Sequence, residues 1–282
     1  MNLLLLITII AGVALQNIAK KHYTQKAGNT GIYLLSALTT LFAALFFIIT
    51  TKNLQWNPEI IGYSAGFSIS FLFATVFMTL SISCGSLSLT SLITSYSLML
   101  PTFYGIIFLK EPVSKFLPIG IVILIVSLFF INKKDGDFSF TPKWILYVLL
   151  AFLGNGMCSV IQKMQQVAFS GAYKNEFMIL ALASVTVILA VISLLKERNS
   201  PKPVIRYMWV PAGISGIMAG TVNLFVMILS GKMSASIMFP LISAGGIVVT
   251  FLSSLFFYKE KVSKTQLLGF VLGILAIIFL NL

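Results

Sequence analysis

Residues 108–132 read FLKEPVSKFLPIGIVILIVSLFFIN, and residues 257–281 read FYKEKVSKTQLLGFVLGILAIIFLN. The two stretches align without a gap, and the alignment places Lys-Glu, Ser-Lys, Gly and Asn in one register. Matched residues in the first stretch are Phe108, Lys110, Glu111, Val113, Ser114, Lys115, Gly120 and Asn132, and in the second Phe257, Lys259, Glu260, Val262, Ser263, Lys264, Gly269 and Asn281. Shared hydrophobicity explains neither the charged nor the amide positions, so the agreement indicates an internal duplication.

The same register continues upstream of these stretches. Residues 92–94 (LIT) fall opposite residues 241–243 (LIS), and a looser echo pairs residues 65–68 (AGFS) with residues 212–215 (AGIS). The duplication therefore predicts two units, residues 1–135 and residues 136–282.

The composition predicts that lipid is the main solvent. Apolar residues make up 58% of the 282 residues and charged residues 9%, and the mean hydropathy is +1.01. Soluble domains carry about 25% charged residues. In lipid every backbone polar group must be satisfied internally, and the apolar runs lack the alternation of a membrane barrel, so helices are expected.

Ten apolar runs are long enough to be membrane spans, since a span needs about 20 residues. We place them at residues 2–20, 31–50, 60–82, 87–109, 114–132, 144–164, 176–195, 207–229, 234–257 and 264–282. Each of the two units holds five spans. Because five is an odd number, the second unit must cross the membrane in the opposite orientation to the first. The predicted fold is an all-α polytopic membrane protein, with ten transmembrane helices as two inverted five-helix repeats that suit alternating access.

The Lys-Glu turns followed by Val-Ser and a Gly-containing apolar span resemble the EamA-type branch of the drug/metabolite transporter superfamily. Phe108–Glu111 with Gly120, and Phe257–Glu260 with Gly269, carry this resemblance. It covers essentially the whole chain, but its motifs are structural and name no substrate. The resemblance implies ten helices around a central cavity, and transport of metabolites, amino acids or organic cations.

Polar residues inside the spans are the candidates for substrate binding, because burying them unpaired is unfavourable by several kcal/mol. The first span of each half supplies Gln16, Asn17 and Lys20, and Asn155, Gln162 and Lys163. The two lysines suit a substrate carboxylate or phosphate. The alternative is that they reach toward headgroups from a helix end.

A second set of candidates for substrate binding comes from the fourth span, from the equivalent position in the ninth span, and from one amide in the eighth span. Its members are Ser91, Thr94, Ser95 and Tyr96, then Ser243 opposite Thr94, and Asn223. Hydroxyls at this spacing, with Ser97 nearby, predict a wall that binds a polar substrate. Hydrogen bonding between helices is the alternative.

Backbone breakers and matched carboxylates are candidates for hinges or gates: Pro101, Glu111, Pro240, Gly245, Gly246 and Glu260. A proline removes a helical hydrogen bond and exposes a carbonyl; a passive kink is the alternative. Glu111 and Glu260 each sit among lysines at a helix junction, where a capping or ion-pair role competes with a gating one.

We expect no catalytic residue, metal site or cofactor, and no enzyme activity, because no Walker loop, metal cluster or Ser/His/Asp set is present. The net charge of +12 lies in short loops, which argues against nucleic acid. Expected partners are a small-molecule substrate and membrane lipids, with a homodimer as one option. We expect a multi-pass location in the cell inner (plasma) membrane. Loop charges favour termini outside, whereas the family resemblance favours termini inside.

The leading functional hypothesis is a secondary transporter, exporter or facilitator, of a small polar or zwitterionic metabolite such as an amino acid. A drug or organic-cation transporter is one alternative, with aromatic rings replacing the missing mid-span carboxylate. A membrane scaffold or lipid-handling partner that does not transport is the alternative from another class.

Overall fold

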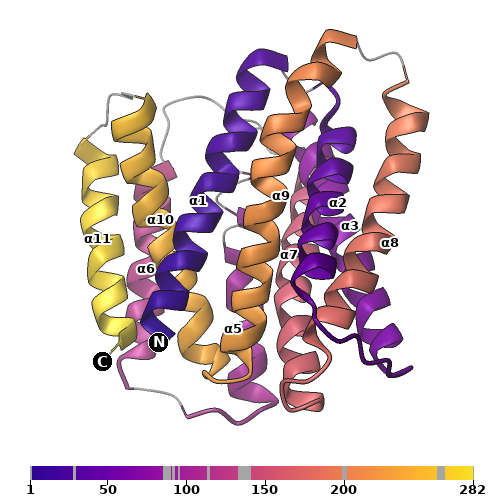
Figure 1. Ribbon diagram of the computed structural model, residues 1–282. Helices are drawn as coiled ribbons and strands as arrows, with labels where there is room; N and C mark the ends of the chain where they lie inside the picture. The colour runs from indigo at the N-terminus through magenta and orange to yellow at the C-terminus, as the bar shows by residue number, and fades with distance from the viewer. Residues whose placement is uncertain are drawn as a thin grey trace. The chain divides into compact units, whose positions relative to one another are not determined.

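The computed structural model describes residues 2–27, 30–84, 90, 93–94, 96–112, 115–132, 141–198, 202–258 and 264–281, and the regular structure in these ranges is helical (Figure 1). The helices are α1 (Asn2–Ala27), α2 (Ile32–Thr50), α3 (Ile60–Cys84), the 3-10 turn η1 (Tyr96–Leu98) leading into α5 (Met99–Ile107), α6 (Leu117–Asn132), α7 (Pro142–Ala168), α8 (Lys174–Lys196), α9 (Lys202–Ser230), α10 (Ala235–Tyr258) and α11 (Lys264–Asn281). One helical segment corresponds to each predicted span, so the all-α polytopic fold is confirmed.

The helix ends differ from the predicted ones where polar residues continue a helix beyond the apolar run. Helix α1 extends to Ala27 rather than residue 20, and α9 begins at Lys202 rather than at residue 207. Pro203 lies in the first turn of α9. A proline is tolerated there because the first-turn N–H groups have no partner within the helix.

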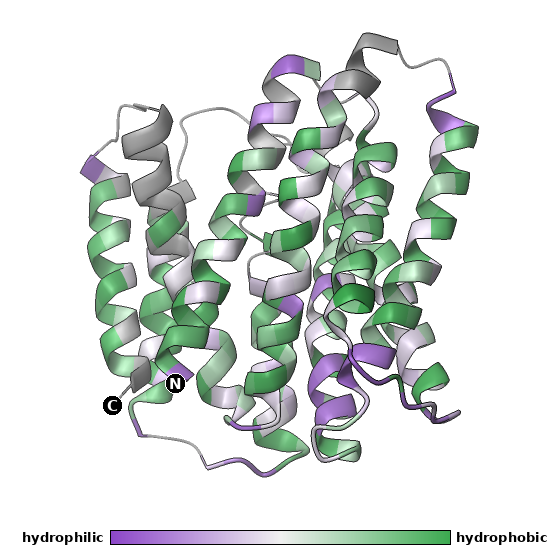
Figure 2. Cartoon of the chain, viewed as in Figure 1, coloured by the Kyte–Doolittle hydropathy of each residue, from purple (hydrophilic) through white to green (hydrophobic). Residues whose placement is uncertain are grey.

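Five helical segments in the described ranges are long and apolar enough to cross a membrane. They are Ile32–Thr50, Ile60–Ser81, Pro142–Ala168, Lys174–Lys196 and Tyr207–Ser230. The other apolar helices are shorter over the described residues. Figure 2 shows hydrophobic residues along most of α2 and of α8, as lipid contact requires.

The helices pack into two compact units that each draw on both halves of the chain. Apart from the first two residues, unit 1 contains Leu3–Leu72 and Met164–Gly231, and unit 2 contains Phe73–Lys163 and Lys232–Leu282. Helices α3 and α7 contribute to both units. This division describes packing, whereas the predicted division after residue 135 describes duplication in the sequence and stays a prediction.

In unit 2, α6 packs against α11, its counterpart in the repeat, with α10 alongside α11 (Figure 1). Buried positions in these helices coincide in the gap-free alignment: Gly120, Leu124 and Ser127 in α6, and Gly269, Gly273 and Ala276 in α11. The Ser127 hydroxyl donates a hydrogen bond of 2.6 Å to the carbonyl of Gly269. Equivalent faces of the two copies therefore meet, which supports the alignment of residues 108–132 with 257–281.

In unit 1, α2 packs against α8 and α9. Glu197, directly after α8, accepts hydrogen bonds of 2.9 Å from the backbone N–H groups of Tyr33 and Leu34. These N–H groups lie in the first turn of α2, where the helix dipole favours a negative charge. The carboxylate thus satisfies backbone donors that have no partner within α2.

Two glycines of α9 give a first prediction. A Cβ added at Gly216 would lie 2.6 Å from the carbonyl oxygen of Thr39 in α2, whereas nothing lies within 4 Å of a Cβ added at Gly213. We expect Gly216→Ala to lower the free energy of unfolding by about 1–3 kcal/mol, because a backbone atom must move. Gly213→Ala should be neutral or should stabilise by up to about 1 kcal/mol. Thermal unfolding in detergent measures both, and equal effects would contradict the packing of α2 on α9.

Candidate functional site

Helix α7 has one face toward lipid and an opposite face toward protein. Leu146, Leu149, Leu153 and Met157 are exposed and recur at spacings of three and four residues, which places them on one side of a helix. Trp144, Val148, Ala151 and Gln162 are buried on the other side. We call this second side the inward face of α7.

Asn155 is an exposed polar residue on this otherwise buried face. It follows Leu146 by nine residues, which is about two and a half helical turns, so it points away from the lipid-facing stripe. An amide in the middle of a membrane helix is unfavourable in contact with lipid. Its position and its exposure together indicate that water reaches the inward face of α7 at Asn155.

Three polar side chains of α7 contact other segments of unit 2. Trp144 Nε1 donates to Thr90 Oγ1 at 3.1 Å, and Asn155 Nδ2 donates to Ser97 Oγ at 2.6 Å. Further along, Lys163 makes an ion pair with Glu111. The contacts follow the length of α7 and tie it to the segment that carries η1 and α5.

The contact at Asn155 lies next to the start of α5, where Pro101 stands in the first turn. Pro101 has no N–H, so it cannot donate to the carbonyl of Ser97, four residues earlier, as an α-helix requires. A Cβ added at Gly156 would lie 2.6 Å from that carbonyl oxygen. Because Gly156 has no side chain, α7 can approach η1 closely enough for Asn155 to reach Ser97.

The ion pair at Glu111 connects four segments of unit 2. Glu111 Oε1 lies 3.1 Å from Lys163 Nζ, and the two side chains are only 11% and 6% exposed. Lys163 Nζ also donates to the carbonyl of Met233 at 2.8 Å. Glu111 Oε2 accepts a hydrogen bond of 3.0 Å from the N–H of Ser236, in the first turn of α10. A negative charge is favoured at a helix N-terminus, so this carboxylate caps α10 as well as pairing with Lys163.

The turn before Glu111 places it in this position. Lys110 has a left-handed backbone conformation with φ 51°, and the N–H of Glu111 donates to the carbonyl of Gly105 at 3.1 Å. A Cβ added at Gly105 would collide with the Glu111 carboxylate and lie 2.9 Å from Cβ of Ala235. Glycine at 105 therefore leaves room for the carboxylate between α5 and α10.

Glu111 lies in the connection between α5 and α6, and its surroundings favour the charged form. Burial raises the pKa of Glu111, but hydrogen bonds from the N–H groups of Ser236 and Ala235 and the contact with Lys163 outweigh burial and lower the pKa below its ordinary value of 4.5. At neutral pH the site is a carboxylate paired with an ammonium group.

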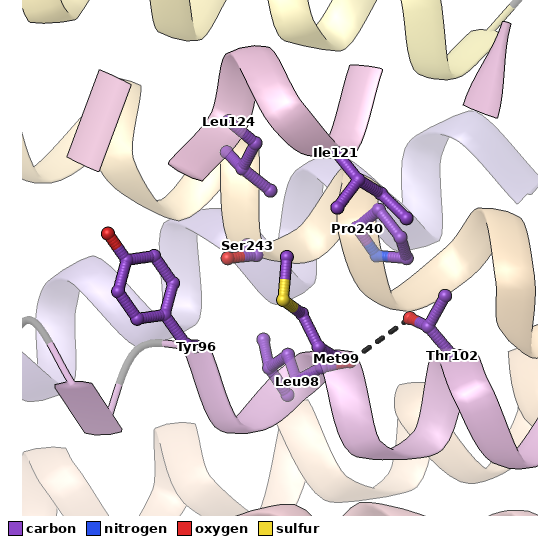
Figure 3. A pocket seen from close by; sticks show the side chains of 8 residues that line it. All are labelled: Tyr96, Leu98, Met99, Thr102, Ile121, Leu124, Pro240 and Ser243. Carbon is purple, nitrogen blue, oxygen red and sulfur yellow. Dashed lines mark hydrogen bonds between the residues drawn. The ribbon is translucent and has the colours of Figure 1, made fainter. Parts of the chain in front are cut away.

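Side chains of α5, α6 and α10 converge on a small cavity in unit 2 (Figure 3). The residues that line it are Tyr96, Leu98, Met99, Thr102, Ile121, Leu124, Pro240 and Ser243. It offers about 10 Å³ to the centre of a water-sized sphere, which is room for about one water molecule. Tyr96, Pro240 and Ser243 thus line the same cavity, but it is too small for a metabolite.

The structure brings some of the predicted site residues together and separates others. Glu111 contacts Lys163; Tyr96 and Ser243 share the small cavity; Asn155 reaches the fourth predicted span at Ser97. The remaining described members lie on several elements: Gln16 in α1, Thr94 before η1, Pro101 in α5, Gln162 in α7, Asn223 in α9, and Gly245 and Gly246 in α10. Asn223 Nδ2 bonds to the carbonyl of Ala219 in its own helix at 2.8 Å. Ser91, Ser95 and Glu260, and the side chains of Asn17 and Lys20, lie outside the described residues.

Sequence reasoning did not identify Ser236, Gly105 or Gly156. Ser236 had a signal, because residues 97–101 read SLMLP and residues 236–240 read SIMFP, with a serine four residues before each proline. The two prolines are not opposite each other in the alignment of residues 108–132 with 257–281. That alignment therefore does not reveal the similarity of residues 97–101 to residues 236–240. Nothing in the sequence around Gly105 or Gly156 indicates a role for either glycine. The need for a residue without a Cβ arises only from the segments that pack against them.

Comparisons with known proteins agree with this architecture. Residues 142–282, half of the chain, match the EamA-like transporter family. A solved structure titled "Crystal structure of protein" superposes with a TM-score of 0.81 and covers 98% of this chain and 94% of its own, at 16% sequence identity. At that identity the likeness shows the fold alone. No curated protein matches the chain in sequence.

Proposed function

Since the chain belongs to the EamA-like transporter family, and is therefore a multi-pass membrane transporter rather than an enzyme, we propose that it is a secondary transporter of a small polar or zwitterionic metabolite such as an amino acid. It works as an exporter or a facilitator in the inner (plasma) membrane, with the substrate and lipids as its partners and a homodimer as one option for its assembly.

The observation that carries this proposal is the neutral character of Asn155, the exposed polar residue on the inward face of α7. Asn155 is exposed on the inward face, whereas the charged groups Glu111 and Lys163 are buried against each other. A carboxylate already paired with an ammonium group offers little net charge to a substrate. An uncharged amide suits a substrate that is itself neutral overall.

In this conformation Lys163 does not bind a substrate anion directly. Its Nζ is held by Glu111 and by the carbonyl of Met233. A substrate carboxylate would have to replace Glu111 to bind Lys163. The proposal therefore keeps Lys163 in the transport pathway as the partner of a gate.

That gate is the contact between Glu111 and the first turn of α10. Alternating access requires a contact that holds one conformation and opens in the other. Glu111 joins α7 and α10 through its carboxylate, and α5 through the hydrogen bond of its N–H to the carbonyl of Gly105. Pro101, Pro240, Gly245 and Gly246 are the proposed flexible points in α5 and α10. Glu260 is the proposed counterpart gate, because it matches Glu111 in the duplicated sequence.

The test is counterflow in proteoliposomes that hold the purified full chain. Vesicles preloaded with a mixture of unlabelled amino acids should accumulate an external labelled amino acid faster than protein-free liposomes with the same load. Gating by Glu111 predicts that Glu111→Leu slows this exchange while the protein still inserts. Accumulation of a quaternary amine in place of amino acids would favour the organic-cation alternative, and no accumulation of either class would overturn the proposal.

A further inference from the structure

We propose that Asn155, positioned by Ser97, is the group that recognises the primary ammonium end of the transported metabolite. This inference rests on the proposed function and names the chemical class that the site selects. It depends on three features of unit 2: the hydrogen bond that orients the amide, the exposure of the amide on the inward face of α7, and the distance to the nearest described charge in α7.

The first step concerns which end of the amide is available. Asn155 Nδ2 donates to Ser97 Oγ at 2.6 Å, and the Ser97 side chain is fully buried. One N–H of the NH₂ group is therefore used inside the protein, and the carbonyl oxygen Oδ1 is the acceptor offered to a ligand. An oxygen of this kind only accepts hydrogen bonds, so it selects a ligand that donates them.

The second step concerns how firmly the amide is held. Ser97 lies in η1, directly before α5, and Gly156 packs against the carbonyl of Ser97. The Ser97 hydroxyl therefore has a defined place beside α7. Because the hydroxyl is held there, Asn155 presents Oδ1 without a large loss of side-chain freedom on binding. Ser97 acts as a positioning residue.

The third step concerns the charge of the ligand. A hydrogen bond from an ammonium group to a neutral oxygen is charge-assisted and stronger than one from a hydroxyl group. Lys163 follows Asn155 by eight residues, about 12 Å between the Cα positions along the helix, and its Nζ is held by Glu111 and the carbonyl of Met233, so it is not offered to the carboxylate of the same α-amino acid. Asn155 therefore binds the amine end of the ligand and not its carboxylate. A quaternary amine is not bound, because it has no N–H to donate.

The experiment compares matched ligands by thermal shift on the purified full chain in detergent. The probes are a panel of amino acids, the 2-hydroxy acid that corresponds to each, and the N-trimethyl derivative of each. The proteins are the wild type, Asn155→Leu, Asn155→Asp and Ser97→Ala. Ser184→Ala is the matched control, because Ser184 is exposed and bonds only to Leu180 of its own helix.

For the wild type we expect at least one amino acid to stabilise the protein, with the 2-hydroxy and N-trimethyl derivatives roughly 10- to 100-fold weaker, the range for a lost hydrogen bond to a charged donor. Asn155→Leu should lose this preference and Ser97→Ala should weaken it. Asn155→Asp, which keeps an acceptor and adds a negative charge, should retain or strengthen it, and Ser184→Ala should leave it unchanged.

The possible failures separate the two proposals. If amino acids bind but the 2-hydroxy acids bind equally well, the inference about Asn155 is wrong and the proposed transport function stands. The same conclusion follows if Asn155→Leu keeps the wild-type preference. If no amino acid stabilises the wild type, the substrate class of the proposed function fails and the inference fails with it. The wild-type ligand comparison decides the outcome even where Asn155→Leu does not fold.

Discussion

Lys163→Met should lower the free energy of unfolding by about 3–5 kcal/mol, because removing one partner leaves the other as a buried, uncompensated charge. Glu111 and Lys163 are 11% and 6% exposed, and their charged atoms are 3.1 Å apart. Glu111→Gln should have an effect of similar size, although its amide oxygen can still accept the hydrogen bond from Ser236. Thermal unfolding in detergent, at pH 7 and fixed lipid content, is the measurement.

The double variant Glu111→Gln/Lys163→Met separates the ion pair from general loss of packing. Without either charge, no buried ion lacks a partner, so the double variant should lose clearly less than the sum of the two single variants. Lys232→Met is a control, because Lys232 is exposed in the loop before α10, and it should change stability by less than about 0.5 kcal/mol. Additive single effects would contradict the pairing of Glu111 with Lys163.

The same contact predicts how stability depends on pH. The folded protein lowers the pKa of Glu111 below 4.5, so the folded state binds this proton less readily than the unfolded state. The stabilisation is therefore fully present above about pH 4.5 and is lost as the pH falls through the lower, folded pKa. The difference in stability between wild type and Glu111→Gln should be constant from pH 7 to about pH 5 and should shrink below pH 4.5. A difference that already shrinks between pH 7 and pH 6 would contradict the assignment of a carboxylate to this gate.

Gly156→Ala should disturb both stability and ligand selection. Its new Cβ would lie 2.6 Å from the carbonyl oxygen of Ser97 and would collide with the side chain of Leu100. Because a backbone atom must move, we expect a loss of about 1–3 kcal/mol in the free energy of unfolding. Moving α7 away from Ser97 lengthens the 2.6 Å bond that orients Asn155, so the preference for amino acids over 2-hydroxy acids should fall as well.

Gly62→Ala in α3 is the matched control for this variant. Nothing lies within 4 Å of a Cβ added at Gly62, so it should change stability by less than about 1 kcal/mol and leave the ligand preference intact. Paired thermal-shift series with and without ligand give both quantities. If Gly156→Ala behaves like Gly62→Ala, the close approach of α7 to η1 is not needed for the site.

The candidate site could be predicted only in part. Asn155 and Lys163 could be identified because a polar residue within an apolar run is conspicuous, and Pro101 because a proline cannot donate a helical hydrogen bond. The partners of these residues could not be identified in the same way. Nothing within the run of α7 indicates that Asn155 bonds to Ser97, or that Glu111 bonds to the first turn of α10 as well as to Lys163.

The sequence by itself determined where the helices lie. Their positions follow from local causes, since the membrane thickness sets the length of an apolar run and each backbone group must bond within its own helix. The duplication of residues 108–132 in residues 257–281 is likewise a property of the sequence. Tertiary structure alone decided which helices meet. Apolar surfaces toward lipid and toward protein look alike in composition, so the contacts of Gly105, Gly156 and Ser236 exist only once α5, α7 and α10 are packed.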